Sequence, residues 1–139
     1  MTPHRVPLNP AAPAGLSLAV EQNHWTLRWR PPADRPVEAW LVGRRLAPVD
    51  EAGDGSSTGD PLVEEATAFG GVAALQQVHG AAVVAVSGPG LSPACDAAVT
   101  RQVNLTLLVR VADCVPIYLV GRAGIGVAHA GWRGTAGRI

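Results

Sequence analysis

The feature that most constrains this chain is its final stretch, residues 126–134, with the sequence Gly-Val-Ala-His-Ala-Gly-Trp-Arg-Gly. The apolar run is typical of a buried strand, and it places His129 at the strand's end. A glycine-flanked Trp-Arg pair follows, which indicates a tight turn. Two upstream segments, Gln76–Gly80 and Val111–Pro116, also carry reactive side chains at the edges of apolar runs. Two histidines and one cysteine are therefore the main chemistry that the chain offers.

Composition predicts one packed globular domain over residues 1–139. The chain is 47% hydrophobic and 16% charged, enough to bury a modest core. Its apolar stretches are strand-sized, well below the roughly 20 residues that span a bilayer. The N-terminus lacks the apolar core of a signal peptide, and two cysteines do not make a disulfide framework. We therefore expect a soluble cytoplasmic protein.

Charge excludes several function classes. The formal net charge is zero, so composition favours neither a nucleic-acid partner nor an anionic membrane. All eleven basic residues are arginine, which excludes a mechanism that uses a Schiff-base lysine.

The first half of the chain predicts an irregular arm, an antiparallel pair of strands and a flexible loop. Residues 1–14 are rich in proline and lack a pattern, whereas residues 16–30 alternate between apolar and polar side chains. The alternation is clearest from Trp25 to Arg30 and predicts a strand there, which pairs with Leu16–Val20. Val37–Leu46 is a further strand candidate. The polar, glycine-rich segment 50–60 predicts a flexible loop, after which Asp60 can cap a short helix that ends at Gly70-Gly71.

The second half is strongly β. The expected strands and the intervening turn are Ala82–Val86, the turn 88–90, Ala97–Thr100, Leu105–Val111, a buried Pro116–Val120, and Gly124–His129. From Thr135 the chain resembles the first turn of a helix. Together these elements predict an α/β (α+β) layered sandwich with a mixed β-sheet.

His79, Cys114 and His129 form a candidate metal site. A thiolate and two neutral imidazoles suit Zn²⁺ with a fourth position open, as in catalytic zinc sites, and the same set tolerates copper. The simpler alternative is structural, because histidines at strand ends often make hydrogen bonds and a cysteine beside proline is often core. Their position where strands meet turns favours a site.

Other candidates flank these three residues. Asp113 is either a general base or metal-site partner, or a turn residue that caps backbone amides. Gln77 either orients a substrate or is solvated. Arg133, with the backbone N–H groups of Gly134 and Thr135, suits a phosphate or carboxylate. Trp132 stacks a purine or fills the core, with core filling favoured.

Three segments resemble one known family. Gln-Val-His-Gly at 77–80, Ala-Asp-Cys-Val-Pro at 112–116 and His-Ala-Gly-Trp-Arg-Gly at 129–134 are similar to motifs of the polyphenol oxidoreductase laccase-domain family. Members of that family are now generally regarded as purine nucleoside phosphorylases. The resemblance is strongest over residues 75–139, and family members continue well beyond the last motif. It therefore implies a shortened member with an incomplete domain.

The resemblance implies a metal, zinc or alternatively copper, held by His79, Cys114 and His129. It also implies phosphorolysis of adenosine, inosine or guanosine, with adenosine deamination and methylthioadenosine phosphorolysis as further activities. Asp96 is similar to an aspartate that precedes a short β segment in the family. A second hypothesis is an inactive metal-binding or interaction domain, which self-associates or pairs with a partner chain that completes the sheet. Copper-dependent phenol oxidation is the third.

Overall fold

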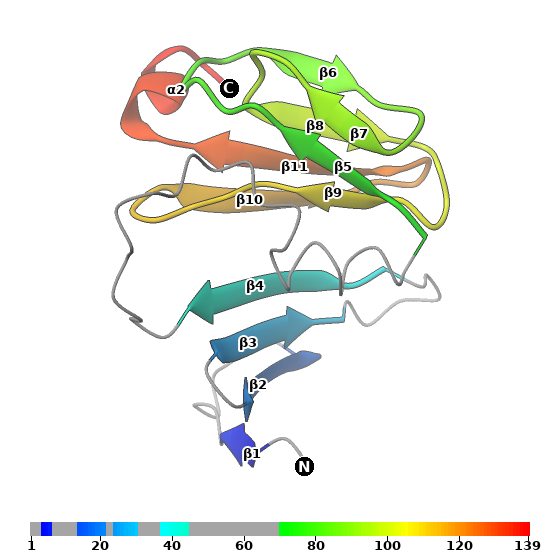
Figure 1. Ribbon diagram of the computed structural model, residues 1–139, viewed down its shortest axis with the longest axis vertical. Helices are drawn as coiled ribbons and strands as arrows, with labels where there is room; N and C mark the ends of the chain where they lie inside the picture. Colours follow the sequence, from blue (N-terminus) through cyan, green and yellow to red (C-terminus); the bar gives the residue numbers. More distant parts are fainter. Residues whose placement is uncertain (1–3, 7–13, 22–23, 31–36, 45–69) are drawn as a thin grey trace. The chain divides into compact units, whose positions relative to one another are not determined.

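The computed structural model describes residues 4–6, 14–21, 24–30, 37–44 and 70–139. The chain divides into two compact units, Met1–Ser57 and Thr58–Ile139, and each is described by itself (Figure 1). The expectation of a single domain stays a prediction. The expected loop at 50–60 and the helix after Asp60 lie outside the described residues. Within those residues, no helix is long and apolar enough to cross a membrane.

The first unit is an antiparallel meander. Its strands are β1 (His4–Val6), β2 (Leu16–Glu21), β3 (His24–Trp29) and β4 (Ala39–Arg44), and they lie in the sheet in that order. The predicted pairing of residues 16–20 with the alternating segment is confirmed, since β2 pairs with β3 along its whole length. The prediction of an irregular arm is wrong at β1, because those three residues pair with β2.

The second unit contains two sheets. A mixed sheet has the order β10-β11-β8-β6, with strands Val115–Val120, Ile125–Ala130, Ala97–Thr100 and Val83–Ala85. Strands β10, β11 and β8 are antiparallel, whereas β6 and β8 are parallel. A parallel sheet has the order β7-β5-β9, with strands Gly90–Ser92, Val72–Leu75 and Thr106–Leu108. The prediction of an α/β (α+β) fold with a mixed sheet is confirmed.

The core of the second unit lies between these two sheets. Leu75 from β5 packs with Ala98 from β8 and with Cys95. Partly buried side chains in or next to β6 and β9 pack against them, namely Val84, Val86, Leu107 and Val109. Cys95 is a buried free thiol. The two sheets thus form the predicted layers, with one face of the mixed sheet turned toward the core.

Strand β10 exists as predicted, but the prediction that it is buried is wrong. Five of its six residues are exposed, with Val115 at 60% and Leu119 at 53%. A continuous apolar run is typical of a strand covered on both faces. Here β10 is an edge strand that pairs with β11, and the apolar run Val-Pro-Ile-Tyr-Leu-Val remains mostly open in the part of the chain that the structure describes.

Helix α2 spans Trp132–Ala136 and begins three residues earlier than predicted. Gly131 is its N-cap in an extended conformation, and Gly137 caps the other end. Figure 1 shows the helix directly after β11, so the strand, the glycine and the helix bring the last motif to one end of the mixed sheet.

Candidate metal site

The three predicted metal ligands lie together. One ligand atom from each of His79, Cys114 and His129 falls within 4.8 Å of the other two. His129 comes from β11, Cys114 directly precedes β10, and His79 follows β5. The two imidazole rings meet edge to face with centroids 4.8 Å apart. Segments far apart in sequence therefore converge on one cluster, as the sequence predicted.

Asp96 lies beneath this cluster and is fully buried. Its carboxylate accepts hydrogen bonds from three consecutive backbone N–H groups, those of Val78, His79 and Gly80, at 3.1, 2.9 and 2.8 Å. Its Oδ1 also lies 2.9 Å from Nδ1 of His129. Burial alone would raise the pKa of Asp96, but the hydrogen bonds with His129 and with the three backbone groups outweigh it and lower the pKa.

His79 adopts a conformation that side chains rarely take. Its φ is 60°, in the left-handed region. For a residue other than glycine this conformation costs on the order of 1–2 kcal/mol. The hydrogen bonds that the N–H groups of His79 and both of its chain neighbours donate to Asp96 offset that cost and fix the backbone that carries the exposed imidazole.

Gly131 brings the backbone against all three candidate ligands. A Cβ atom built on it would lie 3.1 Å from Cys114 Sγ, 3.4 Å from His79 Cδ2 and 4.0 Å from His129 Cε1. Gly134 makes a still closer approach, because a Cβ there would lie 2.6 Å from the carbonyl oxygen of Gly80. At Gly134 a Cβ would force the backbone to move, whereas at Gly131 it would press on ligand side chains that can shift.

The donor set fits a zinc ion. One thiolate and two imidazoles are ligands that zinc prefers, and tetrahedral ligand atoms at usual bond lengths lie about 3.5 Å apart. A cluster already within 4.8 Å needs only small side-chain adjustments to reach that spacing. Among the described residues no other group of three or more histidine, cysteine or acidic side chains qualifies.

The Trp-Arg pair of the last motif follows His129 in the chain and is exposed. Trp132 is 78% exposed, so the expectation that it fills the core is wrong. The guanidinium of exposed Arg133 stacks 5.2 Å from the Trp132 ring centroid. The N–H of Thr135 donates to the carbonyl of Gly131 at 2.9 Å, so it is committed to the helix and not turned to an anion as predicted. Gly134 is buried.

Two further predicted residues flank the ligands. Asp113 is exposed in the bend just before Cys114. Gln77 uses both ends of its amide on Arg110, donating to the carbonyl and accepting from the N–H at 2.7 Å each. Gln77 thus ties the loop after β5 to the segment after β9. Its substrate role, like that of Asp113, stays a prediction.

The structure adds Asp96 and Gly131 to the residues found from the sequence. The resemblance had singled out Asp96, but without a role. The sequence could have indicated that role, because an acidic residue stands directly before the small apolar strand Ala97–Thr100. A carboxylate buried there needs several hydrogen-bond donors. Gly131 separates the histidine from the Trp-Arg pair, and a glycine between two reactive segments indicates a close backbone approach.

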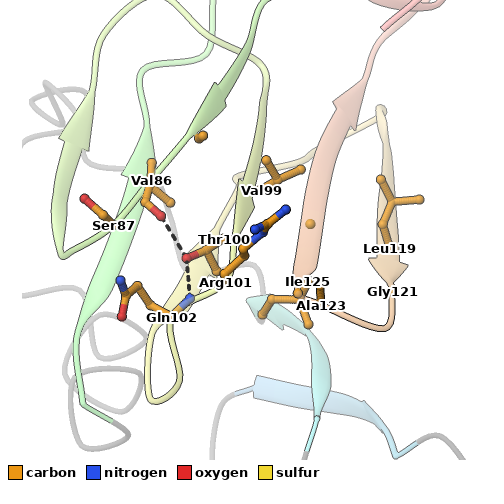
Figure 2. A pocket seen from close by; sticks show the side chains of 13 residues that line it. Val86, Ser87, Val99, Thr100, Arg101, Gln102, Leu119, Gly121, Ala123 and Ile125 are labelled. Carbon is orange, nitrogen blue, oxygen red and sulfur yellow. Dashed lines mark hydrogen bonds between the residues drawn. The ribbon is translucent and has the colours of Figure 1, made fainter.

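A separate hollow lies at the other end of the mixed sheet. Its volume is about 690 Å³, and its lining is largely apolar and includes Val86, Val99 and Leu119. Figure 2 shows its side chains, with the Thr100 hydroxyl bonded to Val86 and Gln102. None of the predicted site residues lines it. The candidate site is therefore defined by its chemistry and lies apart from this hollow.

The family model described as multi-copper polyphenol oxidoreductase laccase matches residues 60–139. The chain belongs to this family. The match includes all three metal-ligand candidates as well as Asp96, Trp132 and Arg133.

Curated relatives carry enzyme names. A purine nucleoside phosphorylase of Deinococcus radiodurans is 49% identical over 69 residues, which cover 48% of this chain and 27% of the relative. A purine nucleoside phosphorylase of Geobacillus stearothermophilus is 42% identical over 76 residues, covering 46% and 28% respectively. An adenosine deaminase from an unknown prokaryotic organism is 61% identical over 46 residues, covering 32% of this chain and 18% of the relative. The matched part of the chain thus spans about a quarter of the length of the first two relatives and less of the third.

Among solved structures, the chain is similar to a hypothetical protein, YfiH, of Bacillus licheniformis. The TM-score is 0.44 with 28% sequence identity, over 53% of this chain and 34% of that one.

Proposed function

We propose that this chain carries the metal-binding part of a purine nucleoside phosphorylase-type site, which takes a purine nucleoside and phosphate to the free base and ribose 1-phosphate. The convergence of His79, Cys114 and His129 within 4.8 Å carries the proposal. The names of the relatives give the reaction class. We also propose that the protein is located in the cytoplasm.

Each residue of the motif has a proposed task. Arg133 donates two parallel hydrogen bonds to phosphate oxygens, and Trp132 offers an exposed ring on which a purine stacks. As phosphate attacks and the glycosidic bond breaks, Asp113 relays the proton that phosphate loses to the leaving purine. Gln77 and Gly134 complete the substrate side of the site. A bound zinc ion, or alternatively copper, would supply electrostatic stabilisation of the charge that develops on the base.

The test combines metal analysis with a phosphate-dependent assay. We expect zinc at about one equivalent per chain, since the three donors form one site, and release of ribose 1-phosphate from inosine, adenosine or guanosine. Cys114→Ala should lose both metal and turnover while the fold, followed by circular dichroism, is kept. Cys95→Ala is the matched control, because it removes the other free thiol from the core and leaves the cluster intact. Unchanged metal content in Cys114→Ala would overturn the assignment.

The same assay tests the narrower activities. Inosine formation from adenosine without added phosphate would identify deamination, and methylthioadenosine as substrate would identify the related phosphorolysis. The name of one relative motivates the first of these measurements.

The exposed edge strand β10 favours a second candidate, a metal-binding domain without turnover that associates with a partner chain or with itself. Among the described residues β10 is the last strand of its sheet and its apolar side chains are mostly exposed, and such edge strands are templates for pairing. Bound metal, no turnover and a dimer in sedimentation analysis would support it. A third candidate, copper-dependent phenol oxidation, is suggested by the family description. Oxygen uptake by the copper-loaded protein with a phenol would support it.

A further inference from the structure

We propose that Asp96 is the positioning residue of the metal site, which sets the tautomer of one histidine ligand and the backbone position of the other. The inference rests on the proposed metal role of the cluster. It concerns the state of the chain before any metal binds, so it can be measured on the metal-free protein.

The carboxylate of Asp96 is saturated by donors. Oδ1 faces the N–H of His79 and Nδ1 of His129, each at 2.9 Å. Oδ2 accepts from the N–H groups of Val78 and Gly80 at 3.1 and 2.8 Å. A carboxylate has about four acceptor positions, and all four are used. One side chain therefore connects both histidine segments, with no capacity left for another partner.

The Asp96 contact decides which nitrogen of His129 is available. An ionised carboxylate can only accept, so the proton of the neutral ring must sit on Nδ1. The lone pair of Nε2 is then free for a metal. Metal-binding histidines are commonly oriented in this way by a carboxylate on the opposite ring nitrogen.

The same carboxylate fixes the segment that presents His79. Three consecutive N–H groups point at one side chain, which confines the loop after β5 and maintains the left-handed conformation at His79. Asp96 itself is held by its backbone, because its N–H donates to Ala82 at 3.1 Å and its carbonyl accepts from the N–H of His129 at 2.7 Å. It lies at the start of the inner strand β8, between β11 and β6.

Replacement of Asp96 by asparagine separates positioning from simple stabilisation. The amide keeps the size of the side chain but has one acceptor oxygen. If that oxygen stays with Val78 and Gly80, the NH₂ group faces Nδ1 of His129 and the ring must carry its proton on Nε2. The opposite orientation gives up the two bonds to Val78 and Gly80. The first orientation loses fewer backbone bonds, so D96N should switch the tautomer and remove the metal-binding lone pair.

The experiment records long-range ¹H–¹⁵N correlations of the imidazole rings in metal-free protein and measures zinc affinity by chelator competition. We expect the Nδ1–H tautomer of His129 in the native chain and the Nε2–H tautomer in D96N. We also expect zinc binding to weaken by about 10- to 100-fold in D96N, as for other partners of ligating histidines.

Thr100→Val is the matched control. Thr100 is a buried polar residue on the same strand, and its hydroxyl bonds to Val86 and Gln102 away from the cluster. This variant should lose stability while keeping the tautomer and the zinc affinity. If it shifts both as D96N does, general destabilisation explains the effect and the positioning role is overturned.

The outcomes separate this inference from the proposed function. An Nε2–H tautomer in the native protein overturns the inference even if D96N fails to fold. Equal zinc affinity in D96N and the native chain also overturns it, with the metal site kept. Zinc binding without phosphorolysis overturns only the proposed enzymatic function. No zinc binding by the native chain overturns both.

Discussion

The site has a buried floor and an exposed rim, and the two differ in how their polar groups are satisfied. In the floor, Asp96 and His129 are 0% and 2% exposed and hydrogen-bond to each other. In the rim, Asp113, Trp132 and Arg133 stand open to solvent. A floor of saturated groups can hold metal ligands at fixed positions, whereas an open rim is free to meet a substrate. Changes to the floor should therefore alter stability and metal binding, and changes to the rim should alter substrate use alone.

The largest effect is expected from Gly134→Ala, at the buried position of α2. The new methyl group would lie 2.6 Å from the carbonyl oxygen of Gly80, so backbone must move. We expect a loss of about 1–3 kcal/mol in unfolding free energy, the usual cost of overpacking, together with weaker zinc binding. Urea unfolding measures the first. Gly88→Ala is the control, because nothing lies within 4 Å of its new methyl group. Equal stability of the two variants would contradict the close approach.

Gly131→Ala should separate metal binding from stability. Its methyl group would lie 3.1 Å from Cys114 Sγ and 3.4 Å from His79 Cδ2, contacts that flexible side chains can relieve by turning away. Zinc affinity should fall several-fold, with a smaller change in unfolding free energy than for Gly134→Ala. Chelator competition beside urea unfolding provides both values. A variant that keeps native zinc affinity would show that the donors do not need their present positions.

Arg133→Ala tests the rim. Since the side chain is exposed, we expect a change in unfolding free energy within about 0.5 kcal/mol and no change in zinc affinity. The KM for phosphate should rise, and Arg133→Lys should restore it only in part because lysine lacks the two-pronged geometry. Arg122→Ala removes the same charge from the turn between β10 and β11 and serves as the control. A loss of zinc in Arg133→Ala would erase the distinction between floor and rim.

The smallest effect is expected from Glu38→Gln, which removes a surface carboxylate from the first unit. Burial alone would raise the pKa of Glu38, but the hydrogen bond from Trp40 and the guanidinium of Arg30 outweigh it and lower the pKa. Because the folded pKa is below the unfolded one, the stabilisation is present above the unfolded pKa and is lost as pH falls through the folded pKa. Glu38→Gln should therefore lose up to about 1 kcal/mol near neutral pH and nothing in acid. Thermal unfolding at both pH values checks this, and a pH-independent difference would argue against the ion pair.

The sequence pattern predicted the positions of the strands better than it predicted which of them are buried. Alternation at 16–30 and the short run 97–100 predicted β2, β3 and β8 because side-chain periodicity is local information. The exposure of β10 depends on which strands lie beside it, and that is not encoded in its own apolar run. Trp132 was misjudged for the same reason, because it is the first residue of a helix that leaves it exposed.

The candidate ligands were found from their types and from the motifs that they share with a family. From the sequence, Asp96 was only similar to an aspartate of the family, and its contacts became visible only in the structure. Its four partners come from segments on both sides of β8, and a network of that kind has no spacing rule in the sequence.

The central claim is that His79, Cys114 and His129 bind one metal ion together. X-ray absorption at the zinc edge of the loaded protein tests it most directly. The expected spectrum has a single sulfur ligand at about 2.3 Å and nitrogen ligands at about 2.0–2.1 Å, and Cys114→Ala should remove the sulfur contribution. A native spectrum without sulfur, or with two sulfur ligands, would contradict the site.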